Sequence, residues 1–295
     1  MDSHDWLPDH PVLRPGLVAV RRDDRHLQVG VEAGDRLVLP DDEGVRRLLA
    51  DLTAGRQPAF EAPGCLHWCR ELVARGFVVD ADLLDRALRG TASRAAVLAT
   101  FARWGPDAPP RLAARANATV ALDADPPWRP AALRLLGTAG LRAATQHDVV
   151  AVRLCVNRDF AHHDSLMATS VPHLVVTELG GRISVGPFVA PGLTACVRCV
   201  VAHRCDNDPG HAAILERHRL EQARAGTGPG SVDPVRMHLA LAYAVQDLVA
   251  FVEGDPPATW SATVKVDPGA DLTRQEWLRH PRCGCCWGDG LALAG

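Results

Sequence analysis

Two clusters of cysteines in the C-terminal part of the chain have the types and spacing of metal ligands. Cys196 and Cys199 form a C-x-x-C pair within "TACVRCVVAHRC", and Cys283, Cys285 and Cys286 lie within "HPRCGCCWG". A two-residue spacer lets both sulfurs of a pair face one ion, and two pairs can enclose zinc tetrahedrally. Cys286 restores that spacing with Cys283, whereas Cys285 is its rival, so only one of these two thiols is expected to bind. Because four thiolates leave no position for water, the pattern predicts a structural zinc.

Other interpretations of the thiols are weaker. Incidental cysteines would not be expected to be paired at both ends, and no thioredoxin-like context accompanies a redox-active Cys196–Cys199 pair. Cys65 and Cys69 are one helical turn apart on an apolar stripe, which indicates core positions. Cys155 lies in a predicted strand. Cys205 is either a spare thiol, which we favour, or an occasional ligand.

The segment "VALDADPPWRPAALRLLGTAGL", residues 119–140, reads as a strand, a short loop and a helix. A G-x-G-x-x-G phosphate cradle in this register would fall on Asp123, Asp125 and Trp128. Two carboxylates would repel a phosphate, the indole would fill its space, and the intervening prolines lack N–H donors. No nucleotide is therefore expected on this chain. An ordinary turn between strand and helix, never a nucleotide site, gives the same functional prediction.

The remaining polar residues show no further catalytic pattern. His162 and His163 are placed in a polar loop, and the histidines are not expected to assemble into a site. Lys265 is the only lysine, in a late strand, and the general excess of arginine is interpreted as coding bias. G-x-S-x-G, H-E-x-x-H and P-loop motifs are absent from the sequence.

Composition excludes several classes of function. The 295 residues are 47% hydrophobic, enough for a real core, and the net charge of −3 gives no electrostatic case for nucleic acid or an anionic membrane. No stretch approaches the roughly 20 apolar residues of a membrane span, and the N-terminus lacks the regions of a signal peptide. We therefore expect a cytoplasmic protein without nucleic-acid or membrane partners.

The first 90 residues predict a small module of strands followed by helices. Three strand-like runs occupy residues 12–40. A helix over 43–55 carries a stripe of Val45, Leu48, Leu49 and Leu52, with Asp41 or Asp42 as its cap. A second helix over 63–76, a return strand over 77–79 and a short helix over 81–89 complete a module of winged-helix size.

The rest of the chain predicts an α/β arrangement. After a linker with a loose helical segment over residues 91–114, a βαβ-like unit is expected. Strand 118–122, helix 130–139 and strand 148–156 form this unit, and strands 172–179, 181–189 and 260–267 follow. The helix over 235–254 is apolar on nearly all sides, which predicts a core position or an interface in a homodimer.

The two cysteine blocks carry a resemblance to a known family. "VGPFVAPGLTACVRCVVAHRCDNDPG" and "LRHPRCGCCWG" resemble its GP-x-V-x-PG-x-TAC-x-x-C and terminal HP-x-CGC blocks, and the resemblance covers about residues 12–290. The family is the leader-peptide-binding, cyclodehydratase-type component of thiazole/oxazole-modified peptide biosynthesis, a branch of the ThiF-like, ubiquitin-activating-enzyme-like superfamily. Its terminal C-G-C makes Cys285 a serious candidate ligand.

The resemblance implies separate roles for the two parts of the chain. Residues 10–90 would be a winged-helix-like (PqqD-like) recognition element for the leader of a ribosomally made precursor peptide. Residues 115–295 would be a degenerate, Rossmann-like ThiF-type domain with structural zinc. The partner would be a YcaO-type cyclodehydratase that forms azolines with ATP, and this chain its non-catalytic subunit. The alternative is an adenylating enzyme that acts on a peptide or carrier protein with an atypical nucleotide site.

The recognition element suggests how a leader would bind. An extended peptide can add to an exposed sheet edge through main-chain hydrogen bonds, and side-chain pockets then give selectivity. The expected edge is the third strand, residues 35–39, with the helix over 63–75 as the groove wall. The nominated contacts are Arg36, Leu37, Val38, Leu39, His67 and Arg70.

Overall fold

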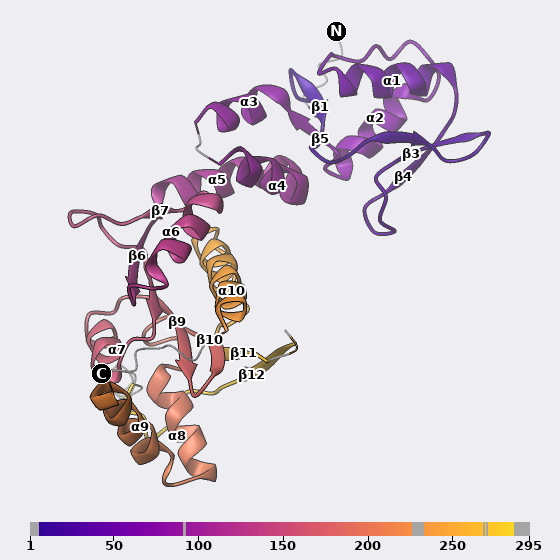
Figure 1. Cartoon of the computed structure of the whole chain (residues 1–295). Helices are drawn as coiled ribbons and strands as arrows, with labels where there is room; N and C mark the ends of the chain where they lie inside the picture. Colours follow the sequence, from indigo (N-terminus) through magenta and orange to yellow (C-terminus); the bar gives the residue numbers. More distant parts are fainter. Residues whose placement is uncertain (1–5, 91–92, 226–232, 268, 270, 286–295) are drawn as a thin grey trace, which may run out of the picture. The chain divides into compact units, whose positions relative to one another are not determined.

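The chain divides into two compact units, residues 1–114 and 115–295. The computed structural model describes residues 6–90, 93–225, 233–267, 269 and 271–285 (Figure 1). The N-terminal unit contains two small antiparallel sheets and several helices. The C-terminal unit is built on one seven-stranded mixed sheet.

The sheets of the N-terminal unit come from the predicted strand-rich region. β2 (Ala19–Arg21), β3 (His26–Val29) and β4 (Leu37–Pro40) form an antiparallel sheet in that order. β1 (Pro11–Leu13), which the sequence did not separate from the others, pairs with the predicted return strand β5 (Val78–Asp80). Both β2 and β4 are edge strands, and β4 pairs only with β3 in the described part of the chain.

The helices of this unit follow their amphipathic patterns. In α1 (Glu43–Thr53) the predicted stripe is buried, and the Asp42 carboxylate accepts a hydrogen bond from the backbone N–H of Val45 at 2.8 Å. α2 (Cys65–Ala74) buries Cys65, Cys69 and Leu72, as predicted, and α3 (Ala81–Arg89) begins at its cap, Asp80. The apolar faces of α1 and α2 join Leu37 and Leu39 of β4 in one core.

The stretch predicted as a linker is more regular than expected. It forms α4 (Arg94–Trp104), a short 3₁₀ turn (Gly105–Asp107) and α5 (Ala108–Asn117). Val97 and Phe101 of α4 pack with Val79 in a second small core of the N-terminal unit. A weak periodicity concealed these helices in the sequence, because their stability comes from packing rather than from an amphipathic stripe.

The large sheet has the strand order β12-β11-β10-β9-β8-β6-β7. The strands are β6 (Thr119–Ala124), β7 (Arg142–Ala143), β8 (Val152–Val156), β9 (His173–Leu179), β10 (Arg182–Val189), β11 (Ala262–Val266) and β12 (Leu272–Glu276). β7, β6, β8 and β9 are parallel, whereas β9, β10, β11 and β12 are joined antiparallel. The α/β class is the one that the sequence predicted, whereas β7, β12 and the antiparallel pairing from β9 to β12 were not predicted.

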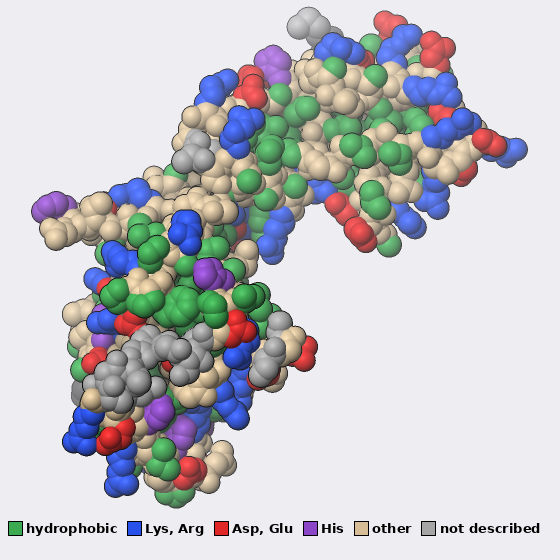
Figure 2. Space-filling model, in the orientation of Figure 1, with side chains coloured by type: hydrophobic (Ala, Val, Ile, Leu, Met, Phe, Trp, Pro, Cys, Tyr) green, Lys and Arg blue, Asp and Glu red, His purple; other side chains and the backbone are tan. Residues whose placement is uncertain are grey.

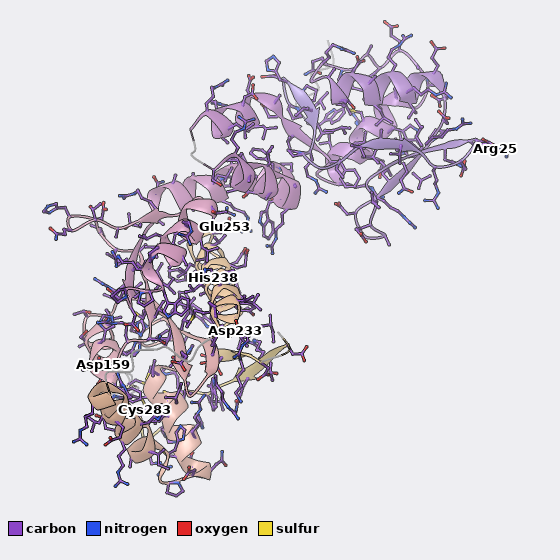
Figure 3. All side chains as sticks on the ribbon, viewed as in Figure 1. Arg25, Asp159, Asp233, His238, Glu253 and Cys283 are labelled. Carbon is purple, nitrogen blue, oxygen red and sulfur yellow. The ribbon has the colours of Figure 1, made fainter. Side chains whose placement is uncertain are left out.

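Side chains on the two faces of the sheet have different neighbours. Alternate residues such as Leu122, Leu154 and Val176 pack against α6 (Arg129–Thr138) and α10 (Pro234–Val252) in the main core. Asp233 caps α10, and the labels of Asp233, His238 and Glu253 follow its course in Figure 3. By length and composition α10 would also pass as a membrane span, but its apolar side chains are central to this core.

Three helices missed by the sequence analysis complete the C-terminal unit. They are α7 (Phe160–Ala168), α8 (Val197–Asn207) and α9 (His211–Ala225), and Figure 1 shows them apart from α10. His162 and His163, expected in a loop, lie in the first turns of α7, where Asp159 caps the helix. These three helices carry several of the residues that build the sites described below.

Candidate metal centre and ligand pocket

Four of the five predicted thiol ligands converge at the start of α8. Cys196 is the N-cap residue of this helix and Cys199 lies in its first turn, whereas Cys283 and Cys285 follow β12. All four sulfurs lie within 4.8 Å of one another. Cys286 lies outside the described residues. The cluster therefore joins the C-terminal segment to the start of α8, and it could hold a metal ion. Its fourth thiol is Cys285, which the spacing alone made the rival of Cys286.

The sulfur separations fit a tetrahedral cage. They are 3.7 Å between Cys196 and Cys199, 3.3 Å between Cys196 and Cys283, and 3.3 Å between Cys199 and Cys285. Zinc–sulfur bonds of about 2.3 Å in a tetrahedron place neighbouring sulfurs about 3.8 Å apart. A disulfide would bring two sulfurs to about 2 Å. The distances thus suit ligation by four thiolates, and the described cysteines form no disulfide.

The surroundings of the cluster favour thiolate at Cys199. Its pKa is lowered to about 4 by the hydrogen bond from the Cys196 thiol, with a further contribution from the backbone N–H of His280. That N–H lies 3.3 Å from the Cys199 sulfur. The His280 ring contacts the Asp206 carboxylate at 3.0 Å, which fixes the segment that leads into Cys283. A helix N-terminus also favours negative charge at both α8 thiols.

The acidic residues at the end of β6, where a phosphate cradle would lie, make ion pairs within the chain. The Asp123 carboxylate lies 3.0 Å from the Arg153 guanidinium and 3.2 Å from the His162 ring. Asp125 is 3.8 Å from Arg158, and burial raises the pKa of its carboxyl. Both acids stand where glycines would expose backbone N–H groups to a phosphate.

Trp128 packs inward from the loop that follows β6. Only 9% of the residue is exposed, and it belongs to the core between the sheet and α10. Its ring meets the ring of His238 edge-on, with centroids 6.2 Å apart. The expectation that the indole fills the space of a pyrophosphate stays a prediction. The two carboxylates and the two prolines remain the features that disfavour phosphate.

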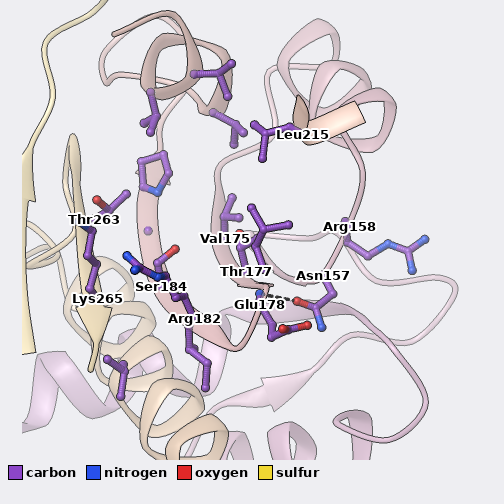
Figure 4. Close-up of a pocket in the computed structure, with 18 of the residues that line it drawn as sticks. Asn157, Arg158, Val175, Thr177, Glu178, Arg182, Ser184, Leu215, Thr263 and Lys265 are labelled. Atoms are coloured by element: carbon purple, nitrogen blue, oxygen red, sulfur yellow. Dashed lines mark hydrogen bonds between the residues drawn. The ribbon is translucent and has the colours of Figure 1, made fainter. Parts of the chain in front are cut away.

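A cavity of about 980 Å³ lies between the sheet and the helices α7–α9. Thr177 of β9, Ser184 of β10 and Lys265 of β11 line its floor, and Leu215 of α9 lies on the other side (Figure 4). Six basic residues line it: Arg158, Arg182, Arg204, Arg219, Arg236 and Lys265. The acids that line it are Asp125, Glu178 and Asp267. The cavity therefore combines apolar walls with an excess of positive charge, which suits an anionic ligand.

This cavity was not predicted from the sequence. Lys265 appeared only as a residue of a late strand, yet its register partner in β10 is Ser184, which places it on the cavity floor. The only signal was the alternation of Thr263, Lys265 and Asp267 with buried apolar residues, a pattern of period two that marks one polar sheet face.

The nominated peptide contacts fall into two groups. Leu37 and Leu39 are buried in the N-terminal core, so their side chains face inward and only their backbone remains for a peptide. Arg36, His67 and Arg70 are exposed, and Val38 is half-buried. The Arg70 guanidinium lies over the Trp6 ring, 5.4 Å from its centroid. In Figure 2 hydrophobic side chains gather between charged ones on the visible face of this unit.

Comparison with solved structures shows the fold of the chain. It is similar to the heterocyclase TruD, with a TM-score of 0.70 and 15% identity over 95% of this chain and 43% of that one. A heterocyclase in complex with substrate and cofactor is similar with a TM-score of 0.68 and 16% identity, over 94% of this chain and 39% of that one. The chain thus spans less than half the length of these heterocyclases.

A second group of similar structures is E. coli MccB. The complex with ATP gives a TM-score of 0.63 at 12% identity, and the microcin C7 biosynthetic enzyme MccB with N-formylated MccA gives 0.62 at 13%. In both cases 94% of this chain and 99% of MccB are covered. No family model and no curated protein sequence matches the chain. These likenesses establish a fold shared with heterocyclases and MccB.

Proposed function

We propose that this chain binds the leader of a ribosomally made precursor peptide and presents it to a YcaO-type cyclodehydratase in the cytoplasm. The partner would then convert Cys, Ser or Thr residues of the peptide to thiazolines or oxazolines. The observation that carries the proposal is the fold shared with part of TruD, combined with carboxylates in place of the glycine cradle. In this proposal the chain itself is a non-catalytic subunit.

The proposed leader site is the edge of β4 that pairs with no other strand among the described residues. An incoming strand would hydrogen-bond to the backbone of residues 35–39, and the exposed side chains Arg36 and Val38 would contact the peptide. His67 and Arg70 of α2 would form the wall of the groove. The positive charge of the two arginines suits acidic residues in the leader.

We further propose that the four-thiol cluster holds a structural zinc ion. Cys196, Cys199, Cys283 and Cys285 supply the donor set and the separations that zinc prefers. Zinc here would connect the C-terminal segment to α8 and stabilise the fold, because its binding free energy adds to the folding free energy.

One observation favours a second function, adenylation of a peptide or carrier protein. The basic cavity lies beside the carboxyl ends of β8 and β9, where open α/β sheets bind ligands. MccB has the same fold in its complex with ATP. Lys265 and Arg182 could hold phosphates at some distance from Asp123. Pyrophosphate exchange by the purified chain would support this alternative.

A titration of the full chain with a fluorescent leader peptide tests the first proposal. We expect a dissociation constant in the micromolar range or below, without release of AMP from ATP. Arg36→Glu and Arg70→Glu should each weaken binding about tenfold or more, because each places a negative charge against an acidic leader. The matched control is Arg94→Glu on the exposed side of α4, which should bind as the wild type does. Equal affinity in all four proteins would refute the β4 site.

A further inference from the structure

A second group of side chains that could hold a metal ion lies away from the four-thiol cluster. Asp123 and Cys155 are direct register partners on the adjacent parallel strands β6 and β8. Their side chains project from the face opposite the main core, because Leu122, Leu154 and Val156 take the core face. The register of the sheet therefore brings a carboxylate and a thiol together from positions 32 residues apart in the sequence.

The third member, His162, comes from the first turn of α7. The Asp159 carboxylate accepts a hydrogen bond from the His162 backbone N–H at 2.8 Å and fixes the start of this helix. The next residue, His163, stacks on His173 of β9 with ring centroids 5.6 Å apart. These two contacts hold the helix over the sheet, so the His162 ring is directed at Asp123 and Cys155 by packing and by a cap.

The distances within this group match a metal site. The His162 Nε2 lies 3.7 Å from the Cys155 sulfur and 3.2 Å from an Asp123 oxygen. All three donor atoms lie within 4.8 Å of one another. Zinc bonds of usual length in a tetrahedron separate sulfur from nitrogen by about 3.5 Å, and nitrogen from oxygen by about 3.4 Å. One ion could therefore reach all three with small adjustments.

A nucleophilic role for this Cys–His–Asp group is less well supported. Burial and the nearby Asp123 carboxylate raise the pKa of Cys155 to about 12, so the free thiol would not be ionised at neutral pH. A divalent ion replaces the thiol proton on binding. Arg153 remains beside Asp123, at 3.0 Å, as the hydrogen-bonding partner that ligating carboxylates commonly have.

We propose that Asp123, Cys155 and His162 bind a divalent transition-metal ion of the zinc class, with a fourth position open to water. The Cys155 side chain is buried, but the side chains of Asp123 and His162 are each 22% exposed, which leaves solvent access on that side. Three protein ligands with one open position distinguish this site from the closed four-thiol cluster. The ion would lie near the basic cavity, because the neighbouring residues Asp125, Asn157 and His163 line it.

Cobalt(II) titration of the metal-free full chain tests this site. Thiolate-to-cobalt absorption in the near ultraviolet and the bound metal per chain after gel filtration would both be measured. If the four-thiol cluster is loaded, two ions per chain are expected in the wild type and one in Cys155→Ser or His162→Gln. If that cluster stays empty, one ion per chain is expected in the wild type and none in either variant.

The matched control is Cys205→Ser, a change of a thiol on α8 outside both clusters, which should keep the wild-type number of ions. His162→Gln serves where Cys155→Ser lowers the melting temperature, because His162 is partly exposed. Identical metal content and absorption in the wild type and in both site variants would overturn the proposal. The proposed metal site does not depend on leader binding. The outcome of the cobalt titration is therefore independent of the outcome of the fluorescent-leader titration.

Discussion

At the scale of single residues, His173 makes the stability of the C-terminal unit depend on pH. Its ring is fully buried, and its Nδ1 lies 2.9 Å from the carbonyl oxygen of Val171, so that nitrogen carries the proton in the neutral form. Burial lowers the pKa of His173 below its usual value of 6.5. The folded chain therefore holds this ring neutral under conditions where the unfolded chain would protonate it.

We expect the free energy of unfolding to fall as the pH drops below about 6.5. Because the pKa of His173 is lower in the folded chain, the unfolded chain binds a proton at this ring first as the pH falls. The stability that the neutral ring contributes is therefore fully present above pH 6.5, and it is lost as the pH falls toward the pKa of the folded state. Urea unfolding of the wild type and His173→Gln between pH 7.5 and 5 measures it. The variant should show a shallower pH dependence, and parallel curves would contradict the assignment.

A buried ion pair offers a second prediction at this scale. The Arg115 Nε lies 2.6 Å from the Glu253 carboxylate, and the side chains are only 11% and 4% exposed. Arg115 also donates to the carbonyl oxygen of Ala139 at 3.1 Å. Arg115→Met should cost about 3–5 kcal/mol in unfolding free energy, because the carboxylate of Glu253 loses its counter-charge.

The double variant Arg115→Met with Glu253→Met separates the pair from general packing. It should recover much of the lost stability, because two buried charges are replaced together by apolar side chains. Chemical denaturation of the wild type, each single variant and the double variant gives the coupling. Strictly additive losses would show that the two side chains act independently.

At the scale of elements, the bulge in β10 shapes the cavity floor. The register between β9 and β10 shifts between Val185 and Phe188, and Gly186 has a φ of +96° there. A Cβ at Gly186 would come within 2.3 Å of the Ala262 carbonyl oxygen. Glycine is therefore required by both backbone conformation and space, and it allows β11 to approach β10 closely.

Gly186→Ala should destabilise the chain by more than Gly181→Ala. Gly181 also has a positive φ, +74°, but a Cβ there meets nothing within 4 Å. The control should lose about 1 kcal/mol through backbone strain, whereas Gly186→Ala adds a backbone clash and should lose several times as much. The midpoints of urea unfolding compare the stability of the two variants. Similar losses of stability would show that the sheet can adjust at the bulge.

Elements with a regular pattern were predictable from the sequence, and those without one were not. The stripe of α1, the return strand β5, α3 and α10 lie where periodicity and caps placed them. α8 begins at Cys196 without a side-chain cap, and its apolar residues follow no stripe. Its position depends on packing with residues distant in sequence, which spacing cannot reveal.

The same distinction holds for the candidate sites. Cys196 and Cys199 are close in sequence and could be recognised, as could the terminal cysteine group. Asp123, Cys155 and His162 come from β6, β8 and α7, and only the register of two parallel strands brings them together. The basic cavity likewise depends on the order β9-β10-β11, which no local motif encodes.

At the scale of the whole molecule, the four-thiol cluster predicts a chelator-sensitive fold. Cys283 and Cys285 connect the end of the described chain to α8, so removal of the proposed zinc ion should loosen the C-terminal unit. We expect the melting temperature of that unit to fall by about 10 °C or more, because each kcal/mol lost shifts it by about 2–4 °C.

Calorimetry with and without a strong chelator measures this fall. Cys196→Ser should mimic the chelator, and zinc added back should restore only the wild type. Cys205→Ser should melt as the wild type does, because that thiol lies outside the cluster. An unchanged transition in the chelated wild type would argue that the four thiols pack without an ion.

The proposed function gives this chain a partner. The similarity to TruD covers 95% of this chain and 43% of that one. Mixing the chain with a YcaO-type protein is thus the proper setting for an activity assay. Under the proposed function, ring formation needs both proteins.

The position of Lys265 has a practical consequence. Since no other lysine occurs in the sequence, an amine-reactive ester at mildly alkaline pH would label one side chain besides the terminal amine. A dye or fluorine tag attached there would report on whatever enters the space between β11 and α9. The rate of labelling would itself indicate an occupant, because a bound anion would shield the amine.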